Sequence, residues 1–328
     1  MSLTAIVPVW NGRDLLAKLL DTIEAQTLRP DEVLIVDNGS TDGAPDLARA
    51  RGARVIPMGC NAGFAAAVNR GIRESRTELI AVLNSDVELE GDYLATLAAQ
   101  PGWFATGKIL AARERPKRFI DGTFDAVCRG GASRRIGHAR PDGPVFSTPQ
   151  SIYSAPWTAA LFRSGLFERV GLLEERFESY LEDVDFGLRC AAHGLSGLYV
   201  PEAVAWHHGS ASLGQWHPDT VRRITRNQIF LIARHYSREM RMECWWPILV
   251  AQVLWGAMAV SRGRGAAWLR GVREGFAVLP EITDHKKRWS VLLEHLMQGE
   301  RLIRSFQDAS GYDTYWRLYF LLTGGQME

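Results

Sequence analysis

The feature that most constrains the fold is a regular alternation of strand-like and helix-like segments over the first 83 residues. Short runs rich in β-branched residues alternate with stretches whose apolar residues recur at helical spacing. This alternation predicts a doubly wound α/β sheet, mostly parallel, with helices on both faces. The strand-like runs are 3–9, 32–36, 54–57 and 79–83, and the helix-like stretches are 13–26, 44–51 and 63–75.

The rest of the chain changes character twice. Residues 113–150 are rich in Arg, Gly and Pro and lack sustained periodicity, which predicts a long loop over the ligand-binding face. The pattern then resumes at 151–162, continues with a helix beginning near Glu182 and reaches a strand at 197–200, and the sequence looks helical from Pro218 onward. We therefore expect an α/β domain over 1–215 and a helical C-terminal region over 216–328.

Composition excludes several classes of protein. The 38 Lys and Arg residues balance 37 Asp and Glu, whereas a dedicated nucleic-acid-binding protein carries a basic excess. The four cysteines stand far apart with no CxxC pair, which fits neither a zinc knuckle nor a disulfide-stapled secreted domain. The first residues lack the basic and small-residue signals of a secretory leader. We expect a cytoplasmic location.

One apolar segment in the helical region has two interpretations. Residues 245–260 are almost uninterrupted apolar sequence, but 16 residues are fewer than the roughly 20 that a spanning helix needs. The segment is either a buried helix of a C-terminal bundle or an interfacial helix lying on anionic lipid. The second interpretation rests on the tryptophans and arginines in and beside it: Trp245, Trp246, Trp255, Trp268, Arg262, Arg264, Arg270 and Arg273.

Carboxylates follow two of the expected strands. Asp37 stands where a strand ends in a turn, so it is either a ligand-binding carboxylate at the mouth of the sheet or an Asx-turn. Asn84-Ser85-Asp86 follows a buried apolar strand, where oxygen ligands suit Mg²⁺ or Mn²⁺ and a helix cap is the alternative. In doubly wound sheets ligands bind outside the carboxyl ends of the strands, so Asp37 and Asp86 would flank one crevice.

Two further motifs bring acids and histidines to this half of the chain. Glu182, Asp183 and Asp185 open a helix, and three acids in four positions exceed what capping requires. Because helical residues two apart point in different directions, one acid reaches a substrate while another organises a loop or a basic side chain. His207 and His208 end a strand-like run, where adjacent side chains face opposite sides and at most one enters a site as a metal ligand.

Taken together, these residues resemble family 2 glycosyltransferases of the GT-A fold, most closely the bacterial rhamnosyltransferase-like branch. Seven stretches match in the family's order and cover roughly residues 3–212. They are 6–12 (IVPVWNG), 36–42 (VDNGSTD), 61–71 (NAGFAAAVNRG), 83–87 (LNSDV), 167–171 (FERVG), 180–185 (YLEDVD) and 206–212 (WHHGSAS).

The resemblance implies a role for each motif. Asp86 and His207 would hold a divalent cation, Mg²⁺ or Mn²⁺, and Asp183 would be the general base of an inverting displacement. Residues 1–112 would form the donor half of the domain and 113–215 the acceptor half. The implied donor-binding residues are Pro8, Asn11, Asp37, Asn61, Gly63, Asn69, Asn84, Ser85 and Asp86, and the acceptor-side or structural residues are Trp157, Glu182 and Asp185.

The implied reaction moves a sugar from a nucleotide-diphosphate donor to a glycan or lipid-linked acceptor in cell-surface polysaccharide synthesis. Rhamnose from dTDP-rhamnose is the favoured donor, with UDP- and GDP-sugars open, because 157–160, 172–175 and 177–178 depart from the family pattern. A lipid-linked acceptor and the tryptophan-rich tail together favour peripheral contact with the inner face of the plasma membrane.

Two other functions are weighed. A sugar nucleotidyltransferase begins with a Gly-rich, basic loop after its first strand, of which residues 10–13 (WNGR) are a poor version. A catalytically silent glycosyltransferase-like assembly protein would not be expected to retain Asp37, Asp86 and Asp183.

Overall fold

The structure is a computed structural model, and it describes residues 1–209, 216–277 and 289–324. The chain divides into two compact units, Met1–Phe124 with Gly137–Ala211, and Asp125–Ile136 with Ser212–Glu328. The segment 125–136, which the sequence analysis placed in the first domain, thus belongs to the second unit. The end of the last matching stretch, 210–212, lies outside the described residues.

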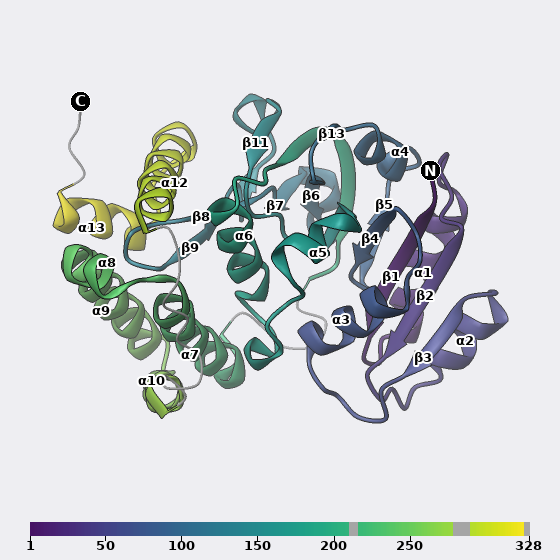
Figure 1. The fold of residues 1–328 in the computed structure, drawn as a ribbon, viewed down its shortest axis with the longest axis horizontal. Coiled ribbons are helices and arrows are strands. Elements are labelled where there is room, and N and C mark those ends of the chain that lie inside the picture. The colour runs from purple at the N-terminus through teal and green to yellow at the C-terminus, as the bar shows by residue number, and fades with distance from the viewer. Residues whose placement is uncertain (210–215, 278–288, 325–328) are drawn as a thin grey trace. The chain divides into compact units, whose positions relative to one another are not determined.

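The first unit contains the expected parallel sheet (Figure 1). Neighbouring strands run β4-β1-β2-β3, all parallel, and their bounds lie within one residue of the predicted ones. The alternation of strand and helix over this part is therefore confirmed. These elements are β1 (Leu3–Val9), α1 (Arg13–Glu24), β2 (Glu32–Asp37), α2 (Ala44–Ala50), β3 (Arg54–Pro57), α3 (Phe64–Glu74) and β4 (Leu79–Leu83).

β1 is buried along its whole length because helices cover both of its faces. Leu3, Ala5, Val7 and Val9 share one apolar cluster with the buried face of α1. Ile6, whose side chain alternates to the other face, packs against α3, where a Cβ on Gly71 would overlap it. A central strand buried on both faces explains why its sequence is continuously apolar.

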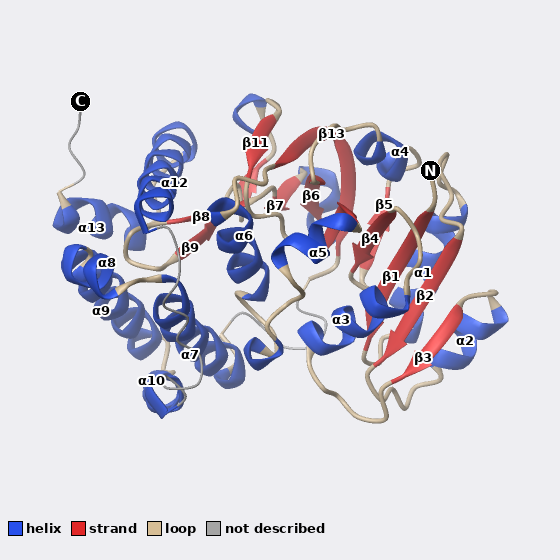
Figure 2. Ribbon diagram, viewed as in Figure 1, coloured by secondary structure: helices blue, strands red, loops and turns tan. Residues whose placement is uncertain are grey.

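The sheet continues through β12 (Ala159–Arg163), which lies antiparallel between β4 and β6 (Phe104–Ala111). β13 (Gly197–His207) runs parallel to β6, and β5 (Val87–Leu89) pairs antiparallel with the end of β13. This mixed, 11-stranded sheet is shown with its helices in Figure 2. The remaining helices of the unit are α4 (Tyr93–Ala98), α5 (Gly165–Val170) and α6 (Glu182–Ala192).

Three segments of this half contain structure that the sequence did not predict. Residues 151–162, where the pattern was expected to resume, contain β11 (Gln150–Ile152) and β12, which are separated at Pro156, a residue that cannot donate to a strand ladder. The strand predicted at 197–200 continues to His207 through a register shift after Val200. The predicted loop 113–150 contains η1 (Ala112–Lys117), β7 (Phe119–Gly122), β8 (Asp125–Val127), β9 (Ser133–Arg135), β10 (Arg140–Pro141) and η2 (Pro144–Phe146).

The second unit consists of the β8–β9 hairpin and helices, with α12 contacting β8. The hairpin's turn is held by a buried network, in which Arg129 pairs with Glu300 at 2.8 Å and Tyr319 donates to Glu300 at 2.6 Å. No described helix is both long and apolar enough to cross a membrane. The helices are α7 (Pro218–His235), α8 (Arg238–Glu243), α9 (Trp245–Ser261), α10 (Gly265–Ala277), α12 (Trp289–Ser310) and α13 (Thr314–Thr323).

Candidate active site

Asp37 ends β2 in a buried turn at the carboxyl edge of the sheet. Its Oδ1 accepts the Ser40 N–H at 2.9 Å, while Oδ2 makes no hydrogen bond within the described residues. Asn11 joins this turn to the end of β1, since its N–H donates to Ser40 Oγ at 2.8 Å and its Oδ1 accepts the Thr41 N–H at 2.9 Å. Pro8 lies in β1 opposite Val36. The Asp37 side chain thus binds the backbone three residues on, rather than two as in an Asx-turn, and this contact leaves its other carboxylate oxygen for a ligand.

The loop before α3 is held by Asn38, to which the sequence analysis gave no role. The Asn38 side chain donates to Gly63 O at 3.1 Å and accepts the Ala62 N–H at 3.3 Å. Asn61 is exposed, and its Oδ1 accepts the Gly63 N–H at 3.1 Å. Gly63 has a φ of 93°, and a Cβ there would lie 3.0 Å from Glu178 O. Glycine is therefore required where this loop approaches the segment before α6.

Asn69 does not offer its amide to a donor pocket. It is buried on α3, where its Nδ2 donates to Leu173 O and to Glu175 Oε1, each at 2.9 Å. Its Oδ1 accepts the Leu173 N–H at 2.9 Å. Because both ends of the amide bind protein partners, the structure places Asn69 as a support for the loop after α5, and the predicted ligand contact is corrected.

The segment Asn84-Ser85-Asp86 joins β4 to β5. The Asn84 N–H donates to Thr158 O at 2.8 Å, which fixes the segment to the start of β12. Asn84 Oδ1 is buried and has no hydrogen-bond partner in the described structure. Ser85 is half-buried, and Asp86 O accepts the His208 N–H at 2.9 Å. A buried amide oxygen with no partner is unusual in a native protein and is available to an ion or a ligand.

His207 lies between two carboxylates. Its Nε2 is 3.1 Å from Asp86 Oδ1, and its Nδ1 is 2.9 Å from Asp121 Oδ2. Burial lowers the pKa of His207, but the hydrogen bonds to Asp121 and Asp86 outweigh it and raise this pKa to about 9. His208, which follows the end of β13, binds Glu88 at 2.6 Å. One histidine of the pair therefore faces Asp86, and the other faces Glu88.

Asp86 and His207 fit a divalent cation. Two neighbouring ligands of an octahedral ion with bonds of about 2.1 Å stand about 3.0 Å apart, close to the 3.1 Å that separates Asp86 Oδ1 from His207 Nε2. A ligating histidine characteristically donates its other ring N–H to a carboxylate, the position that Asp121 occupies. Within the described residues no three His, Cys, Asp or Glu side chains form a complete metal site. The remaining ligands would have to come from elsewhere, for which the Asn84 oxygen and substrate phosphates are chemically suited.

The acids that open α6 have different surroundings. Asp185 is fully buried and paired with Arg189, whose Nε donates to Oδ2 at 3.0 Å and whose Nη1 donates to Val170 O at 2.7 Å. Asp183 is 8% exposed, and its Oδ1 accepts the Val184 N–H at 2.9 Å. Glu182 is buried beside them. Asp185 thus has a buried basic partner, Arg189, and this ion pair distinguishes its surroundings from those of Asp183.

The backbone before α6 is strained. Glu178, Tyr180 and Leu181 have φ values of 61°, 73° and 68°, a region that residues other than glycine seldom adopt. Such strain persists only where the surrounding structure holds it, and it is concentrated at functional sites. One source of support is α3, since the Ala65 N–H donates to Glu178 O at 3.1 Å.

Trp157 is a core residue. It is 2% exposed, and its ring centroid lies 4.5 Å from that of Phe162, 5.1 Å from that of Phe186 and 6.2 Å from that of Phe167. Of the two roles considered for Trp157, acceptor contact or structure, its position favours structure. Since Phe186 belongs to α6, this aromatic cluster fixes the helix that carries Asp183.

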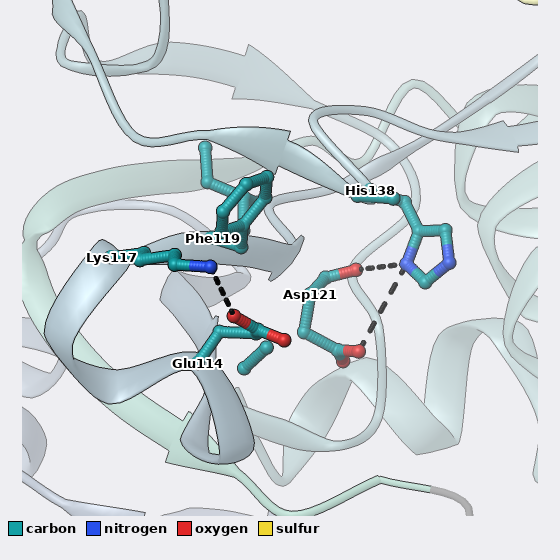
Figure 3. A pocket seen from close by; sticks show the side chains of 8 residues that line it. Glu114, Lys117, Phe119, Asp121 and His138 are labelled. Atoms are coloured by element: carbon teal, nitrogen blue, oxygen red, sulfur yellow. Dashed lines mark hydrogen bonds and ion pairs between the residues drawn. The ribbon is translucent and has the colours of Figure 1, made fainter.

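Asp121 is the site residue that the sequence analysis missed. It lines a pocket of about 400 Å³ (Figure 3) with Ala111, Glu114, Lys117, Phe119, Ile120, His138 and Ala139. Its backbone O lies 2.8 Å from His138 Nδ1, and its carboxylate binds His207. The available signal was an acid in the run Phe119-Ile120-Asp121-Gly122, which is strand-like but only four residues long.

Known proteins resemble this chain in sequence and in fold. An N-acetylglucosaminyl-diphospho-decaprenol L-rhamnosyltransferase of Mycobacterium tuberculosis is 29% identical over 275 residues, covering 75% of this chain and 86% of that protein. The structure of GalNAc-T7 with UDP, GalNAc and Mn²⁺ superposes with a TM-score of 0.61 at 12% identity, covering 86% of this chain and 57% of that one. The structure of the Pyrobaculum calidifontis mannosyltransferase PcManGT, in complex with GDP-Man and Mn²⁺, superposes with a TM-score of 0.52 at 17% identity. The match covers 98% of this chain and 85% of that one.

The structural likenesses confirm the predicted α/β GT-A fold with its helical C-terminal region. The family described as glycosyl transferase family 2 matches residues 4–170, about half of the chain, and includes β1, Asp37 and Asp86. Because this family match agrees with the observed sheet and its strand-end acids, the chain belongs to glycosyl transferase family 2.

Proposed function

We propose that this protein transfers a sugar, with inversion, from a nucleotide-diphosphate donor to a lipid-linked or oligosaccharide acceptor in cell-surface polysaccharide synthesis. Family membership supports glycosyl transfer. The name of the mycobacterial relative supports L-rhamnose as the sugar and a polyprenyl-diphosphate-linked acceptor. An O-antigen biosynthesis protein of Myxococcus xanthus, 32% identical over 230 residues that cover 63% of this chain and 17% of that protein, supports a role in surface polysaccharides.

The observation that carries the proposal is the contact of Asp86 with His207 at the carboxyl edge of the sheet. These two residues would hold a divalent cation, which when bound neutralises the charge that develops on a leaving diphosphate. Asp37, with one carboxylate oxygen outside its turn, would accept a hydrogen bond from the nucleotide base. The donor half of the domain would then be 1–112, and the acceptor half would lie within 113–215.

Asp183 is our assignment for the general base. An acceptor hydroxyl is a poor nucleophile, so a carboxylate near it must take its proton as the new bond forms. The N-terminal turn of α6 favours an ionised acid, which a base must be at neutral pH. Asp185 stands in the same turn, but it is fully buried and engaged by Arg189.

The experiment is steady-state turnover of dTDP-rhamnose, UDP-sugars and GDP-sugars by wild type, Asp183→Asn and the matched control Asp185→Asn. Asp183→Asn should lose roughly 10²–10⁴-fold in turnover while its donor affinity is kept, because the base acts on the acceptor. The control should keep turnover per folded molecule. Near-normal turnover in Asp183→Asn, or collapse in Asp185→Asn alone, would reject the assignment. Formation of a sugar nucleotide and pyrophosphate from a sugar 1-phosphate and a nucleoside triphosphate would instead indicate a nucleotidyltransferase.

We also propose peripheral contact of the second unit with the inner face of the plasma membrane. α9 is exposed along one face, where Trp246, Leu249, Val253 and Val260 are 41–60% exposed. The opposite face of α9 is buried at Pro247, Val250, Ala251, Gly256 and Ala259, so the helix packs on one side and is exposed on the other. Of the large apolar side chains that are exposed in the described structure, all but Met1 and Trp10 lie in this unit. Apolar faces of this extent mark interaction surfaces, and flanking arginines favour anionic lipid.

A further inference from the structure

We propose that Asp121 is a positioning residue for the metal site: its carboxylate holds the His207 imidazole so that Nε2 faces the cation beside Asp86. The inference rests on the proposed function, because the cation is part of it. It extends the site to a residue of β7, a strand outside the two motifs that supply Asp86 and His207.

Each ring nitrogen of His207 faces a carboxylate. The Nδ1 side lies 2.9 Å from Asp121 Oδ2, and the Nε2 side lies 3.1 Å from Asp86 Oδ1. An ionised carboxylate only accepts hydrogen bonds, so both ring nitrogens donate while no cation is bound. A cation beside Asp86 would replace the proton of Nε2, and Asp121 would then keep the remaining proton on Nδ1 and the lone pair of Nε2 directed at the cation.

Asp121 is itself held in place. β7 is antiparallel to β6, which brings Ile120 opposite Leu110 and sets the position of the following residue. The backbone O of Asp121 lies 2.8 Å from His138 Nδ1, and its Oδ1 lies 3.9 Å from the same nitrogen. Both contacts are drawn as dashed lines in Figure 3. A carboxylate fixed by its own strand and by a residue 17 positions later is suited to orient a partner.

The contribution expected of such a residue is large enough to measure. Removing the carboxylate that orients a metal-ligating histidine lowers metal affinity by about 10–100-fold, because ring orientation and tautomer are no longer fixed. A residue that only stabilised β7 would lower the free energy of unfolding and leave the metal affinity of the folded protein unchanged. Metal affinity therefore separates the two roles.

The test is Mn²⁺ binding to the full chain in the presence of dTDP or UDP, followed by the electron paramagnetic resonance signal of free Mn²⁺. The variants are Asp121→Ala, the near-isosteric Asp121→Asn, His207→Ala and, as matched control, Glu88→Gln. Glu88 is suitable because its carboxylate makes the corresponding contact with the neighbouring His208, which follows the end of β13.

Asp121→Ala should raise the dissociation constant for Mn²⁺ by about 10–100-fold, and Asp121→Asn, which keeps an acceptor oxygen, should lie between it and wild type. Glu88→Gln should bind as wild type does. Wild-type affinity in Asp121→Asn and in the folded fraction of Asp121→Ala, with binding lost in His207→Ala, overturns the role of Asp121 alone. Unchanged binding in His207→Ala, or no Mn²⁺ binding by wild type, overturns the proposed metal site and this inference with it.

Discussion

The buried ion pair of α6 allows a quantitative prediction about stability. The side chains of Asp185 and Arg189 are 0% and 5% exposed, and Arg189 Nη2 lies 3.0 Å from Asp185 Oδ2. Asp185→Ala removes the carboxylate and leaves a buried guanidinium whose other contacts are the Val170 carbonyl and the Phe186 ring. The perturbation therefore creates an uncompensated charge rather than a simple cavity.

The expected cost is about 3–5 kcal/mol of unfolding free energy, the range for breaking a buried pair from one side. Replacing both partners with apolar residues of similar volume, Asp185→Leu with Arg189→Met, removes the charge altogether and should cost far less. The double variant loses the hydrogen bond to Val170 O, worth about 1 kcal/mol, so we expect it within about 2 kcal/mol of wild type.

The assay is urea unfolding of wild type, Asp185→Ala, Arg189→Met and the double variant, followed by circular dichroism and analysed as a double-mutant cycle. Single variants that are each much less stable than the double variant are the expected pattern. A decrease of less than about 1 kcal/mol in the free energy of unfolding of Asp185→Ala would refute the reasoning, since a buried guanidinium without its carboxylate should destabilise the folded state by more than that. A double variant as unstable as the sum of the single ones would show that the two side chains act independently.

Three other outcomes are expected. Asp86→Ala should abolish Mn²⁺-dependent binding of the nucleotide donor without unfolding the chain, and turnover that persists in excess EDTA would contradict this. Leu249→Glu with Val253→Glu should stop the protein from floating with phosphatidylglycerol vesicles, while Trp10→Glu, an exposed tryptophan of the first unit, should not. Burial lowers the pKa of His295 to about 4, so the folded state binds its proton less readily than the unfolded state does. This contribution to stability is present above the ordinary pKa of 6.5 and is lost as the pH falls toward 4. From pH 7 to pH 5 it should amount to about 2 kcal/mol, absent in His295→Gln, and equal pH dependence of urea unfolding in both proteins would contradict it.

Several errors in the expected fold have physical causes that can be named. Strands β7 to β11 are two to four residues long, too short for a period of two to be recognised. The segment 125–136 carries no sequence signal that it belongs to the second unit, because its place depends on Arg129 meeting Glu300, 171 positions away. Asn69 carries an amide that could bind a ligand, and only the folded structure shows that this amide is hydrogen-bonded to the backbone of Leu173.

The parallel half of the sheet was determined by the sequence itself. Strands such as β1 are buried on both faces, so their apolar runs are continuous, and the intervening helices carry one apolar face each. The same pattern predicts that Asp37 and Asp86 lie at one edge of the sheet, because the carboxyl ends of parallel strands share that edge. The local residue pattern was therefore sufficient to predict these strands and the position of these two acids.

Only the tertiary structure decided which partners these acids have. Asp86, Asp121 and His207 come from β5, β7 and β13 regions that are separated by long stretches of chain, and no spacing rule relates them. Asp183 and Asp185 are alike in sequence, and the buried Arg189 is what distinguishes their surroundings. A carboxylate becomes a ligand, a base or half of an ion pair through what is packed beside it, and that depends on the folded chain.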